Sequence, residues 1–191
     1  ADPQGHGTSC FCMQKRTVDL STYVVLLGQC SARDAILTTP FKGVELIPSS
    51  MALAAAELEL ADMRDRVMRL KEELVRVKGE YDFVLIDCPP SLGMVTLNAL
   101  SACDSLIIPI QCEYYALEGL SQLIHTINLV RERLNPYLDI EGIVFTMYDA
   151  RTNLSLQVVE NVRANVKQRV YSTIIPRNVR LAEAPSHGYP I

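Results

Sequence analysis

The chain has 191 residues, of which 49% are apolar and 21% are charged, proportions that are normal for a soluble globular protein of one domain. It has no apolar run near the ~18 residues of a transmembrane helix and no basic segment leading into an apolar stretch, so we expect neither a membrane span nor a secretory signal. The net charge of −4 argues against a surface that is basic throughout.

The cysteines favour a reducing compartment. The six residues are scattered, and several lie in apolar stretches, where a free thiol behaves as a small buried side chain. The one close pair, Cys10 and Cys12, lacks the spacing and the partner ligands of a zinc site. We therefore expect a cytoplasmic protein.

The first predicted elements are a short strand and a long helix. Residues 44–47 form a short run that ends at a proline, which is typical of a brief strand. Residues 51–77 are rich in Ala, Leu, Glu and Arg, with Ser49 and Ser50 as candidate caps. This segment is predicted to be helical, with a break near Asp62.

A strand that ends in an acid comes next. Phe83–Ile86 is an unbroken apolar run, the pattern of a strand buried on both faces of a parallel sheet, and Asp87 follows it directly. Open α/β sheets bind ligands beyond the carboxyl ends of their strands, and in nucleotide-binding proteins an Asp at this place holds the water shell of Mg²⁺. The alternative is that Asp87 only caps the next helix.

From residue 92 on, helices and strands alternate. The predicted elements are a helix at 92–102, a strand at 105–110, a helix at 116–134 with one apolar stripe, a strand at 140–147, a helix at 154–166 capped by Thr152 or Asn153, and a strand at 170–175. This alternation indicates βαβ units. We therefore predict an α/β fold with a doubly wound, mostly parallel sheet, in a single domain over residues 1–191.

The stretch from Arg151 to Arg180 is basic although the chain as a whole is acidic. Its only acid is Glu160, and its basic residues are Arg151, Arg163, Lys167, Arg169, Arg177 and Arg180. Such a local excess is either the footprint of a polyanion site or a solvated helix face that happens to be basic. The charge count alone leaves both interpretations open.

Five long segments occur in order along the chain: Asp2–Ser9 (DPQGHGTS), Val84–Ser91 (VLIDCPPS), Gln111–Gly119 (QCEYYALEG), Thr146–Leu154 (TMYDARTNL) and Ile175–Ser186 (IPRNVRLAEAPS). Together they resemble the ParA/Soj-type chromosome- and plasmid-partitioning ATPases, which have a P-loop NTPase-like fold of the deviant Walker type. The resemblance covers the whole chain.

The resemblance implies roles for the acids and for the loop after Asp87. Asp2 matches the acidic residue that the family needs for hydrolysis, near the attacking water and Mg²⁺. Asp87 matches the Walker B acid that holds Mg²⁺ through water. Pro89 and Pro90 match the switch loop that senses the γ-phosphate of ATP.

The resemblance also implies two binding surfaces. Arg151 and Arg180 match arginines that contact DNA without sequence preference when two ATP-bound subunits form a dimer. The segments that match the side where the family holds adenine contain Met147, Pro176, Arg177 and Asn178.

For the intact protein, the resemblance implies hydrolysis of ATP to ADP and phosphate with Mg²⁺. It also implies an ATP-dependent homodimer, non-specific DNA binding on the nucleoid, and a ParB/Spo0J-like centromere-binding partner that stimulates hydrolysis. No membrane partner is implied. Joining two basic patches in one dimer strengthens salt-sensitive phosphate contacts, so the nucleotide would time the attachment to DNA.

The sequence departs from the family pattern in several places. No G-x-x-x-x-G-K-[ST] segment occurs, although the family's P-loop lies ahead of the segment matching Asp2. We therefore expect a domain truncated at both ends, with the first strand and the P-loop missing, that binds ATP poorly and is inactive as given. His6 stands for the usual Asn, either as a ligand or base or as a tolerated surface substitution, and Cys10 and Cys12 stand where Gly is common.

Two other functions stay open at this point. The chain could be a regulatory or interaction protein derived from the family without an ATP cycle, which the missing P-loop favours if the chain is complete. It could also be a MinD-like, membrane-associated division-site ATPase, although that class uses a C-terminal amphipathic helix that this sequence lacks.

Overall fold

The structure, a computed structural model, describes residues 1–11, 19–89 and 91–184. The chain forms two compact units: unit 1 consists of Ala1–Cys103 and Ala182–Ile191, and unit 2 consists of Asp104–Leu181. The single domain over residues 1–191 stays a prediction. Cys12 and Pro90 lie outside the described residues.

Unit 1 is built from short helices around an apolar core. Its small sheet pairs β1 (Leu37–Thr38) with β2 (Glu45–Leu46) in antiparallel orientation. Fully buried side chains from several of the helices, among them Val25, Leu26 and Leu53, make the core. The helices are α1 (His6–Cys10), α2 (Thr22–Leu26), α3 (Ala32–Ala35), η2 (Met51–Ala54), α4 (Ala56–Leu60), α5 (Arg69–Val75), η3 (Lys78–Glu80) and α6 (Met94–Ala102).

The helical segment predicted at residues 51–77 breaks near Asp62, as expected. Turns at residues 61–68 separate η2 and α4 from α5. Ser50 stands at the N-cap of η2 without a side-chain hydrogen bond. The other candidate cap, Ser49, donates its hydroxyl to the carbonyl oxygen of Asp2 (2.6 Å), so this serine anchors a loop instead of starting a helix.

The strand predicted at Phe83–Ile86 and buried on both faces is wrong. The segment has no regular secondary structure, and Phe83 and Leu85 are 85% and 89% exposed. A strand needs a neighbour that satisfies its backbone N–H and C=O groups. The strands that the structure describes in unit 1, β1 and β2, pair only with each other. The apolar run thus lacks the partner that would turn it into a buried strand.

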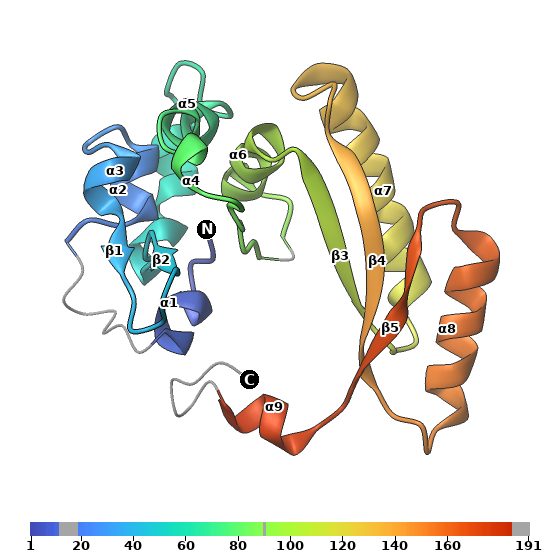
Figure 1. Cartoon of the computed structure of the whole chain (residues 1–191). Coiled ribbons are helices and arrows are strands. Elements are labelled where there is room, and N and C mark those ends of the chain that lie inside the picture. Colours follow the sequence, from blue (N-terminus) through green and yellow to red (C-terminus); the bar gives the residue numbers. More distant parts are fainter. Residues whose placement is uncertain (12–18, 90, 185–191) are drawn as a thin grey trace. The chain divides into compact units, whose positions relative to one another are not determined.

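Unit 2 is a parallel βαβαβ arrangement (Figure 1). The strands β3 (Ser105–Gln111), β4 (Asp139–Tyr148) and β5 (Val170–Pro176) lie side by side in that order. Helix α7 (Ala116–Arg133) connects β3 to β4, helix α8 (Asn153–Asn165) connects β4 to β5, and the two helices contact each other. The prediction of an α/β fold with a parallel sheet is confirmed.

The core of unit 2 explains why these elements match their predicted bounds closely. The apolar stripe of α7 is buried through Leu120, Ile127 and Val130, and Ile143 and Phe145 of β4 are fully buried. Thr152 caps α8, as predicted, because its hydroxyl accepts the Ser155 N–H (3.4 Å). The short helix α9 (Val179–Glu183), which follows β5, was not predicted.

None of the helices in the described part of the chain is both long enough and apolar enough to span a membrane.

Candidate functional site

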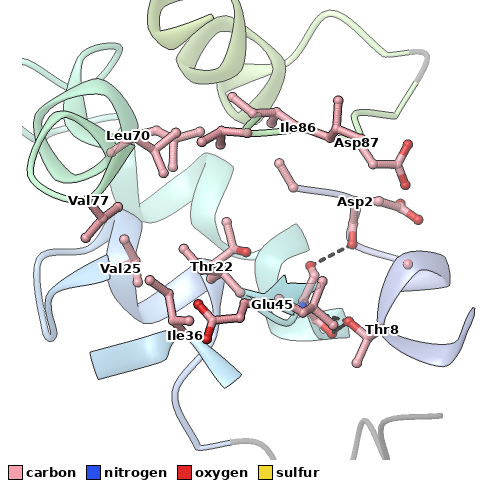
Figure 2. A pocket seen from close by; sticks show the side chains of 18 of the residues that line it. Asp2, Thr8, Thr22, Val25, Ile36, Glu45, Leu70, Val77, Ile86 and Asp87 are labelled. Atoms are coloured by element: carbon pink, nitrogen blue, oxygen red, sulfur yellow. Dashed lines mark hydrogen bonds between the residues drawn. The ribbon is translucent and has the colours of Figure 1, made fainter. Parts of the chain in front are cut away.

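Unit 1 contains a cavity of about 190 Å³ that is apolar over most of its wall and acidic at one end. Asp2 and Asp87 lie together at that end (Figure 2). Two neighbouring carboxylates attract a divalent cation, and they repel a free phosphate unless such a cation lies between. The apolar wall includes Val25, Ile36, Leu46, Ile47, Leu70, Leu74 and Val77.

Backbone N–H groups hold the nearly enclosed carboxylate of Asp2. Its Oδ1 accepts the N–H of Gln4 (2.9 Å), and its Oδ2 accepts the N–H of His6 (3.3 Å). The same Oδ2 lies 3.1 Å from Nδ1 of the His6 imidazole. Gly5 stands between these donors in the left-handed conformation (φ 62°), which residues with a side chain rarely adopt.

These contacts keep Asp2 ionised. Burial by itself raises the pKa of the Asp2 carboxyl, but the hydrogen bonds from Gln4 and His6, together with nearby positive charge, outweigh burial. The pKa is therefore below the ordinary value of 3.8. At neutral pH the group is a carboxylate with a fixed orientation, which suits it to orient a water molecule.

A second set of hydrogen bonds fixes the loop that carries Asp2. The Ser49 hydroxyl donates to the Asp2 carbonyl oxygen, and the Ser49 N–H donates to Oγ1 of Thr8 (2.9 Å). The Thr8 hydroxyl in turn donates to the carbonyl oxygen of Ser49 (3.2 Å). Because Ser49 and Thr8 are both buried, this contact holds the Asp2 loop firmly against the rest of unit 1.

Asp87 differs from Asp2 in being exposed. Within the described residues, no hydrogen bond or ion pair engages its carboxylate, so it is free to bind water or a cation. The described part of the chain also has no group of three His, Cys, Asp or Glu residues placed to hold a metal ion. This donor set suits Mg²⁺, which keeps most of its waters and takes one or two carboxylates together with phosphate oxygens.

The loop after Asp87 is tied to α6. Pro89 is half-buried, and Pro90 lies outside the described residues. The carbonyl oxygen of Ser91 accepts the hydroxyl of Thr96 in the first turn of α6 (2.6 Å). A change in the conformation of this loop would therefore be transmitted to α6 through the hydrogen bond between Ser91 and Thr96.

Unit 2 brings the predicted adenine-side residues to one edge of its sheet. Tyr148 pairs with Pro176 across β4 and β5, and the N–H of Arg177 donates to the Tyr148 carbonyl oxygen (2.8 Å). Met147 adopts a left-handed backbone (φ 54°) where the β4–β5 register shifts. Strain of this kind costs on the order of 1–3 kcal/mol and is concentrated at functional sites. Binding of adenine by this edge stays a prediction.

Arg151, one of the two predicted DNA-binding residues, follows β4 and pairs with an acid. Its Nε and Nη2 donate to Oδ1 and Oδ2 of Asp149 (2.9 and 2.7 Å), a two-bond contact between planar groups. The Arg151 side chain is 87% exposed and that of Asp149 only 18%. The guanidinium is therefore accessible to a ligand, but its charge already has a partner.

The other predicted DNA-binding residue, Arg180, is exposed on α9. Its backbone N–H donates to Oδ1 of Asn178 (2.8 Å), so Asn178 supports the start of that helix.

The sequence analysis missed two contacts at these sites. It noted His6 as a departure from the family pattern but not that its imidazole touches Asp2. It counted charges from Arg151 onward and so left out Asp149, two residues earlier, which neutralises that arginine. The spacing D-x-R after a strand is a signal that could have pointed to this second pair.

Comparisons with known proteins agree on one family. The model of the family described as AAA domain matches residues 1–140. The sporulation initiation inhibitor protein Soj of Bacillus subtilis is 52% identical over all of this chain, which spans 75% of that protein. The chromosome-partitioning ATPase Soj of Treponema pallidum is 48% identical, again over all of this chain and 74% of that protein.

A solved structure shares the fold. The cobyrinic acid a,c-diamide synthase from Mycobacterium smegmatis, with a bound ATP analog and magnesium, matches with a TM-score of 0.87 and 36% sequence identity. The match covers 98% of this chain and 75% of that one.

Proposed function

Because this chain belongs to the Soj/ParA family of chromosome-partitioning ATPases, we propose that it hydrolyses ATP with Mg²⁺ and uses the nucleotide to control its attachment to DNA. The observation that supports specific residues for the chemistry is the pair of carboxylates, Asp2 and Asp87, at one end of the cavity in unit 1. The relatives are partitioning proteins, so neither a MinD-like enzyme nor a regulatory protein without an ATP cycle is favoured.

The two acids have different roles. Asp87, exposed and without a partner of its own in the described residues, would hold Mg²⁺ through water, and the ion would supply positive charge for the phosphates of ATP. Asp2, ionised and held by backbone N–H groups, orients the attacking water. The loop with Pro89 and Pro90 senses the γ-phosphate and passes the change on through the contact between Ser91 and Thr96.

The edge of the sheet in unit 2 contributes two functions. The residues at or just after the ends of β4 and β5 that would hold the adenine are Met147, Pro176, Arg177 and Asn178. Arg151 and Arg180, both exposed, contact DNA phosphates without reading the sequence.

We further propose that ATP brings two copies of the chain together as a homodimer. The dimer doubles the number of phosphate contacts, and tethering two weak patches raises their joint affinity for DNA. A ParB/Spo0J-like partner stimulates hydrolysis, which separates the copies and releases the DNA. This cycle takes place in the cytoplasm, on the nucleoid.

A chimera that places the P-loop segment of the Bacillus subtilis relative ahead of Ala1 allows the chemistry to be tested. We expect this P-loop chimera to hydrolyse ATP with Mg²⁺, and we expect Asp2→Ala to lower the rate by about 10²-fold or more while ATP still binds. Asp82→Ala, which removes an exposed acid from the same unit, is the matched control and should leave the rate unchanged.

Two results would decide against these roles. Full hydrolysis by the Asp2→Ala chimera would remove Asp2 from the mechanism. An unchanged Mg²⁺ dependence in the Asp87→Ala chimera would remove Asp87 as the metal-holding acid.

A further inference from the structure

The guanidinium of Arg151 is occupied by a carboxylate of its own loop. Asp149 accepts two hydrogen bonds from the Arg151 side chain and a third from its backbone N–H (3.0 Å). A planar carboxylate that receives two parallel N–H bonds from a guanidinium uses the geometry with which arginine also binds a phosphate. Asp149 therefore occupies the Nε–Nη2 edge of the guanidinium, where a phosphate oxygen pair could otherwise bind.

The charge of a second arginine also acts on this carboxylate. Hydrogen bonds from Arg151 hold the pKa of Asp149 well below its usual range, and the positive charge of Arg177 adds to this effect. Arg177 follows β5, and its N–H is bonded to Tyr148, the residue before Asp149. Positive charge at the ends of two neighbouring strands thus stabilises one carboxylate, which the chain itself supplies.

We propose that Asp149 is a built-in competitor of DNA phosphodiesters for the guanidinium of Arg151. The inference rests on the DNA-binding function proposed above and adds Asp149 to it. A phosphate takes the Nε–Nη2 edge of Arg151 only when the carboxylate releases it, so Asp149 lowers the affinity for DNA.

The charges explain why Asp149 should lower the affinity for DNA. Paired with Asp149, Arg151 contributes almost no net charge to an approaching polyanion, and the carboxylate itself repels the phosphates. Removing the negative charge of Asp149 leaves the Arg151 guanidinium free to neutralise a phosphate. About one more counterion is then released when DNA binds. The pair is exposed to solvent on the arginine side, so the exchange needs no unfolding.

The test uses the full 191-residue chain and the variant Asp149→Asn. The Asn side chain keeps an oxygen for the Arg151 backbone N–H, so the turn is preserved while the charge is lost. Binding to a short labelled duplex of arbitrary sequence is followed by fluorescence anisotropy at several salt concentrations. We expect the variant to bind about three- to tenfold more tightly at low salt, with a salt dependence steeper by about one.

Asp139→Asn is the matched control. Asp139 begins β4 and pairs with Arg131 (2.6 Å), so this variant also removes one acid from an ion pair of unit 2. It lies at the opposite end of the strand, about 30 Å away by the rise of a β-strand. If net charge alone mattered, both variants would gain affinity equally, whereas the proposal expects the gain only in Asp149→Asn.

A double variant tests whether the gain in DNA affinity of Asp149→Asn requires the guanidinium of Arg151. Asp149→Asn combined with Arg151→Ala should bind no better than Arg151→Ala alone, because the gain requires the freed guanidinium.

Each outcome decides a different point. Tighter binding by Asp149→Asn but not by Asp139→Asn supports the competitor, even if the native chain binds too weakly to measure. Equal or weaker binding by Asp149→Asn, with Arg151→Ala still weakening it, overturns the competitor and leaves the DNA-binding function intact. No binding by any variant at low salt, and none by the P-loop chimera with Mg²⁺ and ATP, overturns the DNA-binding function and the competitor together.

Discussion

The two units carry opposite kinds of site. In unit 1, the carboxylate of Asp2 is enclosed, held by two backbone N–H groups, and anchored through Ser49 to the rest of the unit. In unit 2, Arg151 and Arg180 are both exposed, Arg151 just after β4 of the parallel sheet and Arg180 on α9. The Asp2 site is part of the packed interior of unit 1, whereas the arginines lie on the surface of unit 2.

This difference indicates how each site responds to substitution. Changing a residue at the enclosed acid alters both stability and chemistry, because the same hydrogen bonds serve both. Changing an arginine at the sheet edge alters binding alone, because the core beneath it supplies the stability. Four measurements of the free energy of unfolding test this contrast.

The largest effect is expected in the core beneath the arginines. Phe145 of β4 is fully buried, and Phe145→Ala leaves a cavity between the sheet and its helices. We expect a loss of about 3–5 kcal/mol, measured by urea unfolding. A loss of less than about 1 kcal/mol would show that the sheet of unit 2 is not a rigid support.

The next effect concerns the anchor of the Asp2 loop. Thr8→Val keeps the shape of the side chain but leaves the buried N–H and C=O of Ser49 without their Thr8 partner, so we expect a loss of about 1–3 kcal/mol. Thr8→Ser should restore most of it, because it keeps the hydroxyl.

Thr126→Val is the control for this anchor, because the Thr126 hydroxyl donates only to the Gln122 carbonyl oxygen on an exposed helix turn. Equal losses in Thr8→Val and Thr126→Val would contradict the special role of the anchor.

A smaller effect depends on pH. Folding depresses the pKa of Asp2, so its stabilising contribution is complete above the ordinary value of 3.8 and is lost as the pH falls through the lower folded value. The difference in unfolding free energy between the native chain and Asp2→Asn should therefore be constant near neutral pH and shrink below about pH 4.

Asp82→Asn corrects this comparison for the general effect of removing an exposed negative charge from unit 1. A difference that instead grows on acidification would mean that the Asp2 pKa is raised by folding, contrary to the hydrogen bonds seen here.

The smallest effect is expected at the sheet edge. Arg151→Ala removes an exposed side chain and should change the free energy of unfolding by less than about 0.5 kcal/mol, although it weakens DNA binding. If the loss in stability matched that of Thr8→Val, the arginine edge would be as structural as the enclosed acid, and the contrast between the units would fail.

The sequence predicted unit 2 closely because its signals are local. The apolar stripe of α7, the Thr152 cap and the alternation of strands and helices are all contained in one stretch whose strands pair with each other. The basic excess after Arg151 was likewise visible, since exposed charges can be counted without knowing the fold.

The rest could not be predicted from local patterns. An apolar run such as Phe83–Ile86 indicates a strand only if another segment pairs with it, and the run itself carries no information about that segment. The contact of His6 with Asp2 and the use of Ser49 as an anchor depend on how loops distant in sequence meet. The pairing of Asp149 with Arg151 was missed because it lies in side-chain geometry rather than in composition.

The most direct test of the account is whether nucleotide state controls DNA attachment. With the P-loop chimera, DNA affinity should be high with Mg²⁺ and ATP, fall as ATP is hydrolysed, and stay high in Asp2→Ala, which retains ATP. The same affinity with ATP, with ADP and without nucleotide would contradict the proposed coupling between the acids of unit 1 and the arginines of unit 2.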